Sequence, residues 1–313
     1  MPFPNLLALL FFLCFSSFSN AEPPGDKNDE MSVLVSADWL NRHLDDPDLV
    51  VLDCSIIVTQ EEDGTMQNLT GRSSYDSGHI PSAGFADLLE DLSDTDSPYL
   101  FKPPTPEQFA AAMSALGVGD ETRVVLYDNS NSAWAARVWW MLRAIGFDNA
   151  AVLDGGWSTW IAEGRPISTE GCAYGPETLN VKPRPALFVG PDAVQAAIND
   201  TAVCTINALT PDIHSGENLR YGRAGRIPGS VNISAAEMQD PETLKIPTAE
   251  DSAGRFIAVG ADSAARIIVY CGGGIAASLD AFLLHQLGHE DIAIYDNSMT
   301  EWANDPARPM ETD

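Results

Sequence analysis

The chain has 313 residues, enough for two domains of ordinary size, and its 45% apolar and 20% charged residues are typical of a globular protein. Its 17 basic and 45 acidic residues give a formal net charge of −28. This charge argues against a nucleic-acid partner, because the phosphates would be repelled. An anionic substrate would need a local cluster of arginines.

Residues 1–21 have the pattern of a cleaved secretory signal. The stretch Leu6–Phe18 is apolar, uncharged and too short to span a bilayer comfortably, and Ser19-Asn20-Ala21 places small residues where a signal peptidase reads them. No Lys or Arg precedes the apolar stretch, so an uncleaved anchor is the alternative. We therefore expect a periplasmic or secreted protein with no membrane attachment after cleavage.

Short apolar runs alternate with helical patterns along the rest of the chain. Because the runs are continuously apolar, they predict parallel strands covered by helices on both faces, and hence an α/β fold. In such sheets the functional groups gather at the carboxyl ends of the strands. The predicted elements of the first half are a strand at Leu49–Asp53, a helix at Pro106–Leu116, a strand at Arg123–Tyr127, a helix at Ala133–Ile145 and a strand at Ala150–Leu153.

The chain contains two copies of one plan. Four segments of the first half recur in the same order in the second half, at offsets of 154, 147, 143 and 142 residues. A period this long indicates duplicated domains. We expect a first domain at 32–168, a proline-containing linker at 169–186 and a second domain at 187–311. The recurring pairs begin at Leu34 and Phe188, Gly78 and Gly225, Val124 and Ile267, and Asp154 and Asp296.

Cys271 ends an apolar run and is followed by Gly272, Gly273 and Gly274. The pattern predicts a strand, a tight loop and a helix start, where backbone N–H groups and the helix dipole favour a thiolate. Glycines leave room for a group attached to the sulfur. A buried structural cysteine is the alternative, and the glycine run favours a nucleophile. In the first copy this position holds Asp128, which cannot act in the same way.

Four cysteines remain after the predicted signal. None of them are spaced as C-x-x-C, which makes zinc ribbons and thioredoxin-type motifs improbable, and the five histidines have no convincing metal spacing. A reactive Cys271 must stay unpaired and would leave an odd number, so we expect no structural disulfide. The other three are Cys54, Cys172 and Cys204.

These motifs together resemble those of the tandem rhodanese-type sulfurtransferases, over nearly all of the chain after the signal. The resemblance implies two rhodanese-like domains, of which the first is inactive, and a monomer without cofactor or metal. It implies that Cys271 takes a sulfur atom from 3-mercaptopyruvate or thiosulfate as a persulfide and passes it to cyanide or a thiol. The motifs that carry it are Gly78–Pro81, Gly225–Gly229, Ala136–Trp140, Asp154–Trp157 and 271–276. The residues implied to hold the persulfide are Gly272, Gly273, Gly274, Ile275 and Ala276.

The preferred sulfur donor stays open in the sequence. The neutral glycine loop favours 3-mercaptopyruvate, since thiosulfate-preferring members of the family often carry cations just after the cysteine. Two features oppose this: Gly273 stands where a hydroxyl residue is usual, and 204–208 replaces the usual aspartate–arginine start of the preceding loop.

Arginines near the second copy of the Gly-x-Ile-Pro motif are the candidates for binding the donor. We expect Arg223 and Arg220 to contact it. Arg226 replaces the family's histidine and is expected to be structural, and Arg137 is expected to form an ion pair between the domains.

Two other functions also use a reactive cysteine. A persulfide carrier that delivers sulfur to a protein partner with little small-molecule turnover is an alternative. Cysteine phosphatases need an arginine six residues after the cysteine to bind phosphate, and Ala277 stands there, which makes that activity improbable.

Overall fold

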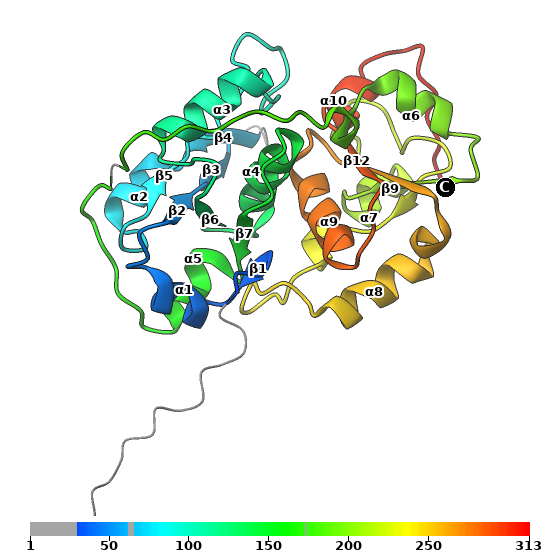
Figure 1. The fold of residues 1–313 in the computed structure, drawn as a ribbon. Helices are drawn as coiled ribbons and strands as arrows, with labels where there is room; N and C mark the ends of the chain where they lie inside the picture. The colour runs from blue at the N-terminus through cyan, green and yellow to red at the C-terminus, as the bar shows by residue number, and fades with distance from the viewer. Residues whose placement is uncertain (1–29, 62–65, 173) are drawn as a thin grey trace, which may run out of the picture. The chain divides into compact units, whose positions relative to one another are not determined.

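The computed structural model describes residues 30–61, 66–172 and 174–313, and the part from Met31 to Asp313 forms one compact unit. The predicted signal at 1–21 lies outside the described residues. Two five-stranded parallel sheets account for most of the strands (Figure 1). In each, helices lie against the sheet, as the continuous apolar runs predict.

The first sheet has the strand order β1-β7-β6-β2-β5, and every neighbouring pair in it is parallel. An antiparallel hairpin, β3–β4, follows β2. The elements of this domain are β1 (Leu34–Val35), α1 (Ala37–His43), β2 (Leu49–Asp53), β3 (Ile56–Gln60), β4 (Met66–Thr70), α2 (Arg72–Ser77), β5 (Gly84–Phe85), α3 (Pro106–Ala115), β6 (Arg123–Tyr127), α4 (Ala133–Ala144), β7 (Ala150–Leu153) and α5 (Gly156–Ala162).

The second sheet has the order β8-β12-β11-β9-β10, again with parallel pairs throughout. Taken by their order along the chain, its strands occupy the same places as those of the first sheet. The predicted duplication is therefore confirmed. The elements are η1 (Pro185–Leu187), β8 (Phe188–Val189), α6 (Pro191–Ala197), β9 (Val203–Asn207), α7 (Pro211–Ser215), β10 (Val231–Asn232), η2 (Ala235–Glu237), α8 (Ala249–Ala258), η3 (Ala261–Ser263), β11 (Arg266–Tyr270), α9 (Ile275–Gln286), β12 (Ile292–Tyr295) and α10 (Ser298–Trp302).

The predicted strand bounds in the first half of the chain are confirmed, because each strand coincides with a continuous apolar run. Strands β2, β6 and β7 have the predicted bounds, and every residue of β2 and β7 is buried. The helices α3 and α4 each end one residue earlier than predicted. The start of α3 is fixed by a capping box between Thr105 and Gln108, with Pro106 in the first turn.

The predicted linker lies along the first domain. The Tyr174 hydroxyl donates to the Ser82 carbonyl at 2.6 Å and accepts from the Val51 N–H at 3.0 Å. Further along, the Lys182 N–H donates to the Ile145 carbonyl at 2.7 Å. These contacts bind the connection to one domain, while the boundaries 32–168, 169–186 and 187–311 stay a prediction.

The domains meet through equivalent helices, because α4 packs against α9 (Figure 1). Each of these helices follows the central strand of its own sheet. The edge of Trp139 in α4 faces the ring of Phe282 in α9, with centroids 4.9 Å apart and planes at 89°. Edge-to-face aromatic pairs of this kind stabilise beyond the area that they bury.

A buried ion pair crosses this interface, which confirms the prediction for Arg137. The Arg137 side chain is 0% exposed, and its Nη2 donates to an Asp296 carboxylate oxygen and, at 2.7 Å, to the Phe101 carbonyl. Removing one partner of a buried pair leaves the other charge uncompensated. The pair therefore holds the first domain to the segment after β12.

Gly274, in the loop after Cys271, lies directly against this ion pair. Its φ is +81°, in the left-handed region, and a Cβ there would lie 2.8 Å from an Asp296 carboxylate oxygen and 2.9 Å from the Asp296 carbonyl oxygen. A Cβ on Gly273 would instead meet nothing within 4 Å. Of these two neighbouring glycines, only Gly274 is required by its surroundings.

We expect Gly274→Ala to lower the free energy of unfolding by about 1–3 kcal/mol, from backbone strain and displacement of Asp296. The matched variant Gly273→Ala should change it by less than about 1 kcal/mol, because its backbone and surroundings accept a methyl group. Urea unfolding of both variants measures the difference. Equal losses in the two variants would contradict this account of the loop.

Candidate active site

Cys271 lies at the carboxyl end of β11, the central strand of the second sheet. Its backbone is fixed on both sides by the start of α10: the Cys271 N–H donates to the Ser298 Oγ at 2.9 Å, and the Cys271 carbonyl accepts from the Met299 N–H at 3.0 Å. The residue is 2% exposed. The sulfur makes no hydrogen bond to any described residue, so these contacts fix the backbone of Cys271 and not its thiol.

The loop after Cys271 presents a ring of unpaired donors. The backbone N–H groups of residues 272–277 reach no acceptor within the part of the chain that the structure describes. The first turn of a helix lacks intrahelical acceptors for its N–H groups, and the dipole adds partial positive charge there. This N–H ring is therefore suited to a buried negative charge.

The first domain shows what such a ring binds. The Asp128 carboxylate, 1% exposed, accepts four backbone N–H groups of its own loop. Burial raises the pKa of the Asp128 carboxyl, and these N–H donors act against that shift. In this copy the side chain at the cysteine position fills the ring. The donors to one oxygen are Ser130 at 2.9 Å and Ser132 at 3.1 Å, and to the other Trp134 at 3.1 Å and Ala135 at 3.0 Å.

Because the domain is duplicated, the N–H donors of the first domain have equivalents in the second. Trp134 and Ala135 are the second and third residues of α4, and Ala276 and Ala277 hold those positions in α9, after a loop that is one residue shorter. The predicted ring 272–276 therefore extends to Ala277, which the sequence analysis did not include. Alignment of the two copies at their helix starts would have found it.

The two arginines predicted to bind the donor have different surroundings. Arg223 is half-buried, and its guanidinium donates to the Asp305 and Arg308 carbonyls, each at 2.9 Å. Arg220 is exposed and forms no ion pair with any described residue; its guanidinium carbon lies 5.9 Å from the Tyr221 ring centroid. Arg223 thus has a structural role, Arg220 is free, and donor binding by either stays a prediction.

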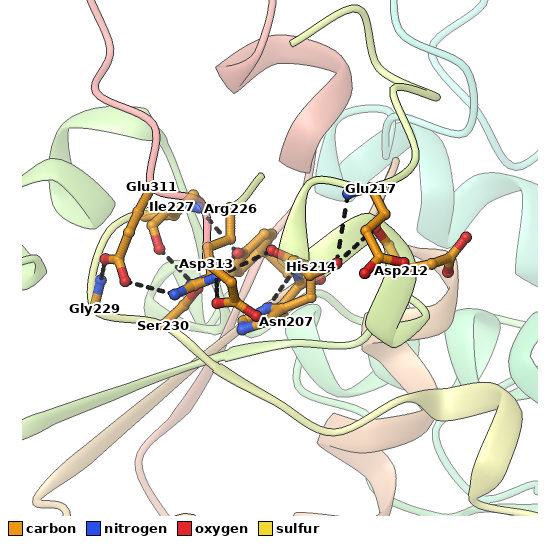
Figure 2. Close-up of polar contacts among 12 residues, drawn as sticks. Asn207, Asp212, His214, Glu217, Arg226, Ile227, Gly229, Ser230, Glu311 and Asp313 are labelled. Atoms are coloured by element: carbon orange, nitrogen blue, oxygen red, sulfur yellow. Dashed lines mark hydrogen bonds and ion pairs between the residues drawn. The ribbon is translucent and has the colours of Figure 1, made fainter. Parts of the chain in front are cut away.

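Arg226 is structural, as expected. Its guanidinium forms ion pairs with Glu311 and Asp313, both at 2.6 Å, and donates to the His214 carbonyl at 3.3 Å (Figure 2). A second Glu311 oxygen accepts the Gly229 N–H at 2.8 Å. Burial, together with the Arg226 charge, lowers the pKa of His214 to about 4. This network ties the loop before β10 to residues 311–313.

Tyr221 is a neighbour of the loop that the sequence analysis missed. A Cβ on Gly272 would lie 1.9 Å from the Tyr221 hydroxyl oxygen, so the phenol rests against the residue next to Cys271. Burial and the proximity of Cys271 raise the pKa of Tyr221 to about 12. No sequence motif predicts this contact, because it joins two loops that are far apart in the sequence.

Three other cysteines lie among the described residues. All are unpaired, and burial raises the pKa of each of the three thiols, which disfavours their thiolates. These are Cys54, Cys172 and Cys204. No group of His, Cys, Asp and Glu side chains among the described residues has the arrangement of a metal site. No helix in the described segments is long and apolar enough to cross a membrane.

Comparisons with known proteins indicate one family. The family described as the rhodanese-like domain matches residues 36–163 and 208–305. The chain is 34% identical over 323 residues to Thiosulfate/3-mercaptopyruvate sulfurtransferase 1, mitochondrial, of Arabidopsis thaliana, covering 95% of this chain and 80% of that protein. It is 32% identical over 286 residues to the 3-mercaptopyruvate sulfurtransferase of Escherichia coli K12, covering 88% and 97%.

A solved structure agrees with these relatives. The crystal structure of SseA from Escherichia coli, described as showing the rhodanese fold of the 3-mercaptopyruvate enzymes, matches with a TM-score of 0.74 and 30% identity, over 86% of this chain and 99% of that one. The chain therefore belongs to the rhodanese-like family, as a tandem-domain sulfurtransferase.

Proposed function

We propose that this protein transfers a sulfur atom through a persulfide on Cys271. The observation that carries the proposal is the contrast between the two N–H rings. Asp128 fills the first ring with its own carboxylate, whereas the N–H groups of the second ring, beside a cysteine, have no acceptor among the described residues. A persulfide on Cys271 would place its negatively charged outer sulfur in the second ring.

The reaction needs only this chain and two small molecules. With 3-mercaptopyruvate, the Cys271 thiolate attacks the donor sulfur, an S–S bond forms and the C–S bond breaks. The carbon fragment leaves with the electron pair as an enolate and takes up the proton of the donor thiol, which gives pyruvate. Cyanide or a thiolate then attacks the outer sulfur and the thiolate of Cys271 returns. With thiosulfate, the leaving group is sulfite.

The proposed donor is 3-mercaptopyruvate or thiosulfate, the two compounds named in the Arabidopsis relative. The uncharged loop 272–274 favours the first, because thiosulfate carries a second negative charge that nothing on these glycines would match. Arg220, exposed and without an ion pair among the described residues, is the cation proposed to attract the donor. Both named relatives are sulfurtransferases, so a carrier role is not favoured.

Intact-protein mass spectrometry tests the persulfide. After exposure to either donor, the wild-type protein should gain one sulfur atom and lose it on addition of cyanide, with thiocyanate formed. Cys271→Ser should gain no sulfur and lose turnover on both donors, and Cys54→Ser serves as the control that keeps both. Full activity in Cys271→Ser would refute the mechanism, and a stable persulfide without turnover would favour the carrier.

The variant Cys271→Asp tests whether the N–H ring binds a negative charge, and this test does not depend on enzyme turnover. Its carboxylate should accept the ring's N–H groups as Asp128 does in the first domain, so the protein should be inactive but more stable than Cys271→Ser. Hydrogen bonds to a charged group contribute about 1.5–3 kcal/mol each, and desolvation of the carboxylate offsets part of this. Thermal unfolding of the two variants gives the comparison. A less stable Asp variant would argue against a ring suited to anions.

We also propose that residues 1–21 direct export and that the mature protein is a monomer without a nucleic-acid partner; the sequence pattern and the net charge support this. Expression of the full chain in a bacterial host should give a periplasmic protein that begins at Glu22 by N-terminal sequencing. A protein that retains residues 1–21 in the membrane fraction would instead indicate the uncleaved anchor.

A further inference from the structure

The Tyr221 side chain is held in place from both sides. Its ring packs on a buried cluster that includes Tyr270 and Met299. The loop that carries it is tied to the carbonyls of Asp305 and Arg308 by the Arg223 guanidinium. The Arg226 guanidinium ties the same loop to Glu311 and Asp313 (Figure 2). The hydroxyl beside Gly272 therefore belongs to a fixed side chain, which favours a precise contact over a chance one.

The hydroxyl of Tyr221 is an unused donor. It makes no hydrogen bond to any described residue, although the ring is half-buried. The tyrosines at the ends of the adjacent strands differ in this respect. The Tyr270 hydroxyl lies 2.8 Å from the Ser230 Oγ and accepts the Ile227 N–H at 3.2 Å, and the Tyr295 hydroxyl donates to Glu301 at 2.7 Å. Of these three phenols, only Tyr221 is left for a ligand.

We propose that the Tyr221 hydroxyl is a catalytic hydrogen-bond donor to the sulfur transferred at Cys271. The proposal rests on the proposed persulfide and adds one residue to it. The outer sulfur is bonded to Cys271 and therefore forms next to Gly272, the residue against which the hydroxyl rests. With 3-mercaptopyruvate the donor sulfur is a neutral thiol and gains negative charge when the persulfide forms, so a hydrogen-bond donor aimed there stabilises the product and the transition state leading to it.

The phenol keeps its proton throughout the reaction. Because its pKa is raised to about 12, Tyr221 stays a neutral donor at any pH used for assay. It donates a hydrogen bond and transfers no proton, so the atoms and electrons of the sulfur transfer balance without it. The backbone N–H ring and this hydroxyl would then contact the outer sulfur together.

The variant Tyr221→Phe tests the proposal, because it removes the oxygen and keeps the ring packing. We expect turnover to fall about 10- to 100-fold, the factor for loss of one hydrogen bond to a charged group, with the melting temperature unchanged. The matched control is Tyr174→Phe, another half-buried tyrosine whose pKa is raised to about 12 and which lies against the first domain. It should keep wild-type turnover.

One readout separates a catalytic role from a structural one, and a second tests whether the phenol acts as a neutral donor. The persulfide of Tyr221→Phe, followed by intact mass after removal of the donor, should form more slowly and decay faster than in the wild type. The fold-loss in turnover should also be constant between about pH 6 and pH 9, because the phenol does not ionise there. A loss that changes across this range would count against a neutral donor.

A second variant covers the case in which Tyr221→Phe loses stability. In Gly272→Ala the new methyl group would lie 1.9 Å from the hydroxyl oxygen and 2.7 Å from the ring carbon that bears it, so the phenol would be displaced. Turnover should fall by at least a similar factor, and the double variant should be no slower than Gly272→Ala alone, because one hydrogen bond is lost only once. Losses that multiply would overturn the proposal.

The outcomes distinguish this proposal from the one on which it rests. If Tyr221→Phe matches the wild type in turnover and persulfide lifetime while Cys271→Ser is inactive, the role of Tyr221 is refuted and the persulfide mechanism stands. If the wild-type protein forms no persulfide on Cys271, both proposals fail.

Discussion

The ring of backbone N–H groups at the start of α9 needs acceptors from outside the helix, and the two domains meet this requirement differently. A buried donor left unpaired costs about 1–3 kcal/mol, and several such donors converge here. The first domain meets the requirement internally through Asp128. In the second, these N–H groups have no acceptor among the described residues, and under the proposed mechanism the sulfur on Cys271 accepts them. On that proposal the same backbone loop serves stability in one copy and chemistry in the other.

The first domain, in which Asp128 replaces the equivalent of Cys271, contributes to this site through packing. It supplies α4, which packs on α9, and Arg137, whose ion pair with Asp296 lies against Gly274. Since a left-handed residue in that place admits no side chain, the loop is fixed by the same contact that joins the domains. The active loop therefore depends on both halves of the chain, although its nucleophile comes from one.

What the sequence predicted correctly was either local or repeated. The strands β2, β6 and β7 follow from apolar runs, and the duplicated domain follows from four segments that recur in the same order. Arg137 was placed by its aromatic neighbours. Tyr221 was missed and the contacts of Arg223 with backbone carbonyls were not predicted, because their partners, Gly272, Asp305 and Arg308, lie on other loops. Hydrophobic periodicity carries no information about contacts between loops.

The distribution of cations limits how an anionic donor is attracted. The net charge of −28 repels anions at long range. Arg137 and Arg226 form ion pairs and Arg223 binds backbone carbonyls, so Arg220 is the member of this group without an ion pair to the part of the chain that the structure describes. Attraction at the cysteine must then come mainly from N–H dipoles, which act over a few ångströms. Such dipoles cannot recruit a donor from afar, but they stabilise charge where the sulfur is transferred.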